Sequence, residues 1–218
     1  MADTREELLL KMYDQMFGDI NRHILVVWQS VSVLIGAFAV LALAEKQVIS
    51  IDLAIALVVL IACWLLAHLL DAGYWYNRNL TIIANIERQF LKPSDIHDIH
   101  YYFGKHREHN SMLTHLKIQR ALGIGILILV GLFHLLTRII PGLTGDWDTF
   151  DPQKVLPYVA LIAGLWYLNK LKDNRDASFA EFLQNSPGIE VDTTGAVYGV
   201  GHGFKSPIAG GAAPPIKP

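Results

Sequence analysis

Four blocks of apolar residues, separated by polar segments, dominate the pattern along the chain. A helix needs about 20 mostly apolar residues to cross the hydrocarbon of a bilayer. The blocks span residues 24–44, 53–70, 121–140 and 155–169. We therefore predict an all-α polytopic membrane protein with four transmembrane helices, arranged as two hairpins. The last block is the shortest, and a buried or interfacial helix is the alternative for it.

The polar segment before the first block, residues 1–23, has the pattern of an amphipathic helix. Thr4 and Glu7 have the spacing of a capping box, which favours a helix start. The apolar stripe has the 3.6-residue period of a helix and consists of Leu9, Met12, Tyr13, Met16, Phe17 and Ile20. The opposite face is acidic and would be repelled by anionic lipid. We expect the stripe to pack against another cytoplasmic helix.

The segment after the second block, residues 71–120, predicts a helical extension beyond the membrane. No proline occurs between Leu53 and Lys92, so one helix should run through both the membrane and the water. Its outer half is apolar on two sides, and we expect the N-terminal helix and the returning segment 111–120 to cover it. The result would be a cytoplasmic helical stalk.

The C-terminal segment, residues 170–218, divides into two parts. Residues 170–184 are compatible with a short amphipathic helix. After Pro187 the sequence is rich in Gly and Pro, which predicts a flexible tail that cannot fold alone. We expect the tail and residues 71–120 to be where a cytoplasmic protein partner would bind.

Charge predicts how these segments face the membrane. Fifteen of the 18 Lys and Arg residues lie before the first block, between the second and third, or after the fourth. The other three are Lys46, Arg138 and Lys154. Because positive residues accumulate on the cytoplasmic side, we predict an inner-membrane protein that crosses four times, with both termini cytoplasmic. The formal net charge of −2 gives no basic field for nucleic acid.

A histidine-rich turn within residues 71–120 is the one candidate metal site. Its histidines form two His-x-x-His pairs, His97 with His100 and His106 with His109. Gly104 could bend the chain so that the two pairs face each other. The adjacent His-His pair of membrane di-iron oxygenases and the H-E-x-x-H of zinc hydrolases are both absent. The alternative is an exposed polar segment, and we expect no cofactor.

Polar and small residues inside the blocks are the remaining candidates. His68 and His134 are intramembrane ionisable groups, which usually face the interior of a bundle. His68 precedes Asp71 by three residues and could pair with it. Small residues that allow close helix packing occur in three blocks: Ser32 and Gly36 in the first, Gly123 and Gly131 in the third, and Ala160 and Gly164 in the fourth. No nucleophile–base pair or nucleotide loop occurs, so we do not expect an enzyme.

The layout of residues 5–91 resembles the SLATT-type bacterial membrane effectors. The resemblance consists of an N-terminal helix, a tight hairpin turning at EKQVISID, and the continuous extension YWYNRNLTIIANIERQF. It implies an oligomeric, pore-forming or membrane-perturbing component of a bacterial antiviral defence or stress system, acting in the lipid bilayer as a homo-oligomer. The second pair of blocks departs from that layout. The alternatives are a membrane anchor or regulatory subunit, and a histidine-dependent membrane metalloenzyme.

Overall fold

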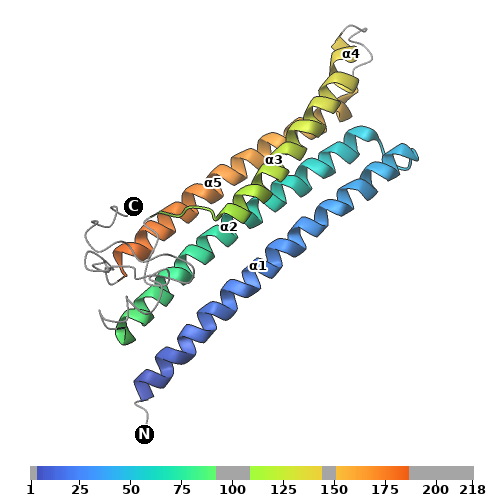
Figure 1. Cartoon of the computed structure of the whole chain (residues 1–218). Helices are drawn as coiled ribbons and strands as arrows, with labels where there is room; N and C mark the ends of the chain where they lie inside the picture. Colours follow the sequence, from blue (N-terminus) through green and yellow to red (C-terminus); the bar gives the residue numbers. More distant parts are fainter. Residues whose placement is uncertain (1–3, 92–108, 144–150, 187–218) are drawn as a thin grey trace, which may run out of the picture.

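The computed structural model describes residues 4–91, 109–143 and 151–186, and every regular element in these ranges is helical. The elements are α1 (Thr4–Glu45), α2 (Ile51–Phe90), α3 (Thr114–His134), the π-helix η2 (Leu135–Ile139), α4 (Ile140–Leu143), the 3₁₀ helix η4 (Pro152–Val155) and α5 (Leu156–Gln184). The long helices lie side by side, with α2 between α1 on one side and α3 and α5 on the other (Figure 1). The predicted all-α fold is confirmed.

The predicted N-terminal helix and first apolar block form the single 42-residue helix α1. At 1.5 Å per residue, α1 is about 63 Å long, roughly twice the thickness of bilayer hydrocarbon. Residues 71–90 likewise continue α2, which has 40 residues and passes through Gly73 without a break. The prediction of a helix that extends well beyond its apolar block is confirmed for α2. The continuity of α1 was not predicted, because the N-terminal helix and the first block were treated as separate elements.

A tight turn joins α1 to α2. The N–H of Val48 bonds to the carbonyl of Leu43, and that of Gln47 bonds to Ala44, each at 3.0 Å. Gln47 has a φ of 59°, so this turn is a Schellman motif with its left-handed residue at Gln47. Ser50 then caps α2 by accepting a hydrogen bond from the N–H of Leu53 at 3.2 Å. The hairpin is therefore closed by local backbone chemistry.

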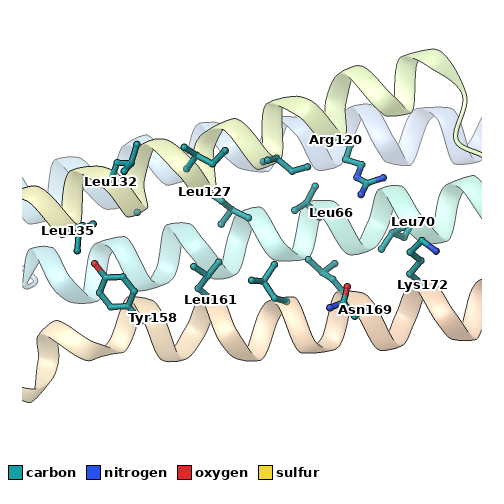
Figure 2. A pocket seen from close by; sticks show the side chains of 15 residues that line it. Leu66, Leu70, Arg120, Leu127, Leu132, Leu135, Tyr158, Leu161, Asn169 and Lys172 are labelled. Carbon is teal, nitrogen blue, oxygen red and sulfur yellow. The ribbon is translucent and has the colours of Figure 1, made fainter. Parts of the chain in front are cut away.

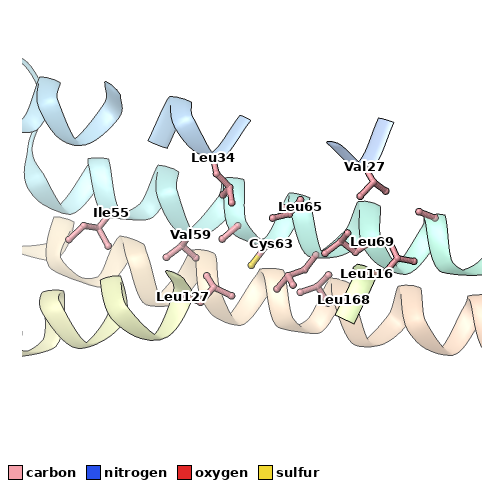
Figure 3. Close-up of a cluster of buried hydrophobic side chains, with 13 residues drawn as sticks. Val27, Leu34, Ile55, Val59, Cys63, Leu65, Leu69, Leu116, Leu127 and Leu168 are labelled. Carbon is pink, nitrogen blue, oxygen red and sulfur yellow. The ribbon is translucent and has the colours of Figure 1, made fainter. Parts of the chain in front are cut away.

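The hydrophobic core follows the central helix (Figure 3). In the most apolar stretch of α2, 56% of the residues are buried, against 22% in that of α1 and 17% in that of the segment Thr114–Leu143. The core side chains from α2 include Ile55, Val59, Cys63, Leu65, Leu66 and Leu69. Val27 and Leu34 from α1, Leu116 and Leu127 from α3, and Leu168 from α5 pack against them. The outer faces of the flanking helices keep large apolar side chains exposed.

Three helical segments, α1, α2 and Thr114–Leu143, are long and apolar enough to cross a membrane. The fourth predicted crossing, residues 155–169, is not among them. It occupies the first half of α5, where the 15 uncharged residues between Lys154 and Lys170 reach only about 22 Å. The predicted short helix at residues 170–184 is the second half of α5, so the two form one 29-residue helix.

The polar halves of α1, α2 and α5 pack together at one end of the bundle (Figure 1). Of the predicted stripe on α1, Ile20 is buried and Leu9, Tyr13, Met16 and Phe17 are half-buried, whereas Met12 is exposed. The Tyr13 hydroxyl donates to Glu87 of α2 at 3.1 Å. The expectation that this stripe packs on another helix is therefore confirmed, with Met12 as the exception.

The other side of the α2 extension is covered by the returning segment and also by α5. Asn77 donates to the side chain of Asn110 and to the carbonyl of Ser111, each at 3.0 Å. From α5, Phe179 is buried and its ring meets the edge of Tyr74. The prediction of two covering segments was therefore incomplete, because α5 is a third.

Candidate functional site

A buried polar cluster lies at the end of the bundle opposite to the polar halves of the helices. Its carboxylate is Asp52, in the first turn of α2, with only 1% of its side chain exposed. The backbone N–H groups at the start of a helix favour a negative charge there. Desolvation nevertheless costs several kcal/mol for a buried ion, so the carboxylate requires partners.

Three side chains from other elements complete this cluster. His134, the last residue of α3, is fully buried and places Nε2 2.8 Å from Asp52 Oδ1. Arg138, in η2, bonds to both carboxylate oxygens, with Nε at 3.1 Å and Nη2 at 2.8 Å. Tyr158, in the first turn of α5, lies with its hydroxyl 3.1 Å from His134 Nδ1. The cluster therefore joins α2, α3, η2 and α5.

The π-helix η2 has a local cause in the sequence. Pro141 follows it, and a proline lacks an N–H and collides with the carbonyl four residues earlier in an α-helix. The wider turn relieves that collision, and the N–H of Ile140 bonds back to Leu135, five residues earlier. Thr137 also donates its hydroxyl to the carbonyl of Phe133 at 2.7 Å. This local widening carries Arg138 beside Asp52, and π turns are frequent at functional sites.

Hydrogen bonding within the cluster is complete with a neutral imidazole. Asp52 accepts both bonds from Arg138. With a hydrogen on Nε2 alone, His134 would donate from Nε2 to Asp52 and accept at Nδ1 from the Tyr158 hydroxyl. Asp52 and Arg138 cancel in charge, so this arrangement places no net charge in the interior. Such a network holds helices in one relative position. It contains no activated nucleophile and no open ligand position, so its chemistry is that of a clamp between helices.

Sequence reasoning identified His134 but missed its partner. Asp52 directly precedes the second apolar block, and nothing in the sequence pattern connected it to the third block. Two signals could have found the pair. First, Asp52 lies at the start of the second apolar block, on the side of the membrane on which His134 and Arg138 end the third block in the predicted topology. Second, a carboxylate at that depth needs a cation nearby.

The other predicted polar candidates occupy different places. His68 is half-buried, with its ring centroid 4.2 Å from that of Trp64. The expected pairing of His68 with Asp71 was wrong, because Asp71 forms an ion pair with Arg175 of α5. The long cationic side chain reaches Asp71 from the neighbouring helix.

Of the four histidines proposed for a metal site, His97, His100 and His106 lie outside the described residues. His109 is described and is exposed. Within residues 4–91, 109–143 and 151–186, no group of three or more His, Cys, Asp or Glu side chains could hold a metal ion. The predicted histidine turn thus remains a hypothesis.

The predicted close-packing residues divide into two sets. A Cβ added at Gly164 would lie 2.5 Å from Cys63 Sγ, and one at Gly123 would lie 3.0 Å from Leu66 Cδ2. Ala160 packs at the edge of the same core. An added Cβ at Gly36 or Gly131 would meet nothing within 4 Å. The first set brings α3 and α5 close to α2, whereas Gly36 lies on the outward face of α1 and Gly131 borders the open space between α3 and α5.

Ser32 lies on the outward face of α1 with Gly36. Its side chain is exposed, and its hydroxyl donates to the carbonyl of Trp28 at 3.2 Å. The predicted pair of small residues on the first apolar block therefore makes no close helix contact within the described part of this chain.

Comparison of the chain with models of protein families, with curated proteins and with solved structures finds no match. The class of this protein is therefore defined by its own fold. It is an all-α, membrane-associated protein, and within residues 4–91, 109–143 and 151–186 three helical segments are long and apolar enough to cross a bilayer.

Proposed function

We propose that the chain is an integral protein of the cytoplasmic membrane that acts as an oligomeric effector, assembling side by side to perturb the membrane or open a pore. The observation that carries this proposal is the outer face of α1. This face is a continuous exposed stripe of large apolar and small residues: Leu25, Trp28, Ser32, Ile35, Gly36 and Ala39.

The stripe has the composition of an interface between membrane helices. Small residues allow two helix backbones to approach, and the large side chains beside them supply van der Waals contact. The opposite face of α1, with Val27, Leu34 and Ala37, is already buried against α2. The outer face is thus available to a second copy of the chain.

A topology of four crossings with both ends in the cytoplasm is part of this proposal. The start of α1, the end of α2 and the end of α5 lie at the same end of the bundle (Figure 1), and most of the Lys and Arg residues belong to the segments at this end. The α1–α2 turn and the start of α5 lie at the other end. α5 runs antiparallel to α3 and packs on α2, which supports a fourth crossing although its apolar stretch is short.

The test is expression of the full chain in a bacterium with a dye that reports membrane potential. We expect expression to depolarise the membrane, and Gly36→Leu to abolish both depolarisation and the oligomer seen by crosslinking. Gly18→Leu is the matched control, because Gly18 is on the same helix and an added Cβ there also meets nothing within 4 Å. A monomer that leaves the membrane polarised would contradict the proposal.

A membrane anchor for a cytoplasmic partner is the second candidate function. The observation that favours it lies at the N-terminal end of α1, outside the apolar block, where Leu8, Leu10 and Met12 are 58%, 51% and 41% exposed. Exposed apolar side chains in a segment that faces water favour a protein partner. In that case Leu8→Glu with Leu10→Glu should abolish co-purification of the partner, and Gly36→Leu should leave it unchanged.

A further inference from the structure

An apolar groove runs between α3 and α5, with α2 as its floor (Figure 2). Its volume is about 610 Å³. The lining is mostly aliphatic and includes Leu66, Leu127, Leu132, Leu161 and Leu165. Tyr158 lies toward one end of the groove, and Arg120 and Lys172 lie at the other (Figure 2). The groove is therefore apolar along its length and cationic at one mouth.

A second, polar cavity of about 210 Å³ adjoins the cationic mouth and shares Leu70, Arg120 and Lys172 with the groove. Its charged lining comprises four cations, Lys117, Arg120, Lys172 and Arg175, and the carboxylate of Asp176. Four positive charges against one negative charge favour an anionic group in this cavity.

The hydrogen bonds of Asp176 show which cations are already occupied. Asp176 accepts from Lys172 at 2.6 Å and from Asn110 at 2.9 Å. Arg175 is paired with Asp71. Lys117 and Arg120 form no ion pair with any residue that the structure describes, and Arg120 adds to the positive field at Lys172. Among these residues, Lys117 and Arg120 thus remain without a carboxylate partner at the mouth of the groove, although Asp173 adds a negative charge near Lys172.

The size of the groove limits what can occupy it. Tyr158 and Lys172 are 14 residues apart on α5, or about 21 Å, the extended length of an acyl chain of about 16 to 18 carbons. A helix of this length and about 10 Å in diameter would fill about 1,650 Å³, well above the groove's 610 Å³. The groove therefore has the length of one extended acyl chain, whereas a helix could enter it only in part.

We propose that this groove binds one acyl chain of an anionic phospholipid, with the lipid phosphate between Arg120 and Lys172. The inference rests on the proposed topology, which places Arg120 and Lys172 at the cytoplasmic leaflet, where anionic lipids attract basic residues. The lipid would fill the space between α3 and α5 and neutralise the cationic mouth.

The experiment measures lipid retained by the purified full chain, using native mass spectrometry after reconstitution with equal amounts of phosphatidylglycerol and phosphatidylcholine. We expect preferential retention of one phosphatidylglycerol per chain. Arg120→Gln with Lys172→Gln should reduce the preference roughly tenfold or more, because each basic residue contributes substantially at an anionic surface. Arg22→Gln with Lys170→Gln makes the same charge change outside both cavities and should leave the preference unchanged.

A second variant tests the apolar part of the site. Gly131 lines the groove, and an added Cβ there meets nothing within 4 Å. Gly131→Phe should fill the groove and abolish retention of both lipids. Gly125→Phe, on the same helix but outside the groove, is the control because Gly125 also has open space.

Three results would overturn the inference: equal retention of the two lipids, displacement of phosphatidylglycerol by inorganic phosphate, or dissociation of an oligomer by Gly131→Phe. Equal retention would show that the site does not select lipids by charge. Displacement by phosphate would show that it binds any small anion, and dissociation of an oligomer would show that a second copy of the chain occupies the groove. Because retention is measured on purified protein, it is separate from depolarisation. Loss of selective lipid retention with intact depolarisation would reject this inference alone, and the reverse would reject the effector function alone.

Discussion

At the scale of single residues, Asp52 shows how a polar side chain is tolerated deep within an apolar bundle. Its carboxylate is 1% exposed and makes three hydrogen bonds to His134 and Arg138. Both partners lie in one segment far from Asp52 along the chain, and Asp52 and His134 are 82 positions apart. The sequence indicates that each of these polar residues needs a partner, but it does not say which one, because pairing depends on how the helices are rotated.

Replacing Asp52 should expose the energetic role of this cluster. Asp52→Asn would leave Arg138 without its anion and His134 without its strongest acceptor, and breaking a buried pair costs about 3–5 kcal/mol. We expect a large fall in the thermal midpoint of helix loss, measured by circular dichroism in detergent micelles. Asp173→Asn changes an exposed aspartate and should have little effect. Equal midpoints for the two variants would show that the cluster does not hold the helices together.

At the scale of elements, the contact between α5 and α2 depends on small residues at one crossing. Gly164 lies so close to Cys63 that a side chain at that position cannot fit without a shift. The spacing Ala160-x-x-x-Gly164 predicted a close approach, and the structure assigns it to packing within the chain. The similar pair Ser32-x-x-x-Gly36 faces outward. Two motifs with the same spacing thus have different surroundings, and spacing alone does not distinguish them.

Gly164→Ala should destabilise the bundle although alanine favours helix. Overpacking typically costs about 1–3 kcal/mol, against a gain of up to about 1 kcal/mol from helix propensity. Adding Cys63→Ala removes the sulfur and should recover part of the loss, which a double-mutant cycle of thermal midpoints measures. Gly125→Ala, in open space, should be neutral or stabilising. A stabilising Gly164→Ala would show that α5 is not held against α2 at this point.

At the scale of the whole molecule, the long helices combine an apolar bundle with a polar stalk. In the stalk, burial raises the pKa of the Glu87 carboxyl above its usual value, and the hydrogen bond from Tyr13 partly opposes this change. Burial, with the nearby Glu87, raises the pKa of Tyr13 to about 12. The Tyr13 hydroxyl therefore keeps its proton at neutral pH, and burial disfavours the charged form of Glu87, so ionisation of this carboxyl weakens the packing of α1 on α2.

The raised pKa of Glu87 determines whether the protein gains or loses stability as pH rises. Between the ordinary pKa of a glutamate and the raised pKa of Glu87, the folded chain binds more protons than the unfolded chain. The free energy of unfolding therefore falls as pH rises through this window. Glu87→Gln should stabilise the chain at neutral pH and remove this part of the slope.

The measurement is the thermal midpoint of the full chain at pH 5 and pH 8, compared between the wild type and Glu87→Gln. The exposed Glu6→Gln is the matched control and should keep the slope of the wild type. A wild type that gains stability from pH 5 to pH 8 relative to Glu87→Gln would contradict the sign.

Local physics within the sequence determined the helices of this protein, their approximate lengths and their apolar faces. The first apolar block carries no charge, which favours a long helix at α1. No proline occurs between Leu53 and Lys92, which favours a long helix at α2, because helix formation depends on neighbours three and four residues away. Tertiary structure alone decided that α5 joins α3 on α2, that His134 meets Asp52, and that Arg120 and Lys172 flank one groove. These contacts depend on the rotation and relative position of whole helices, which follow from the packing of the entire bundle.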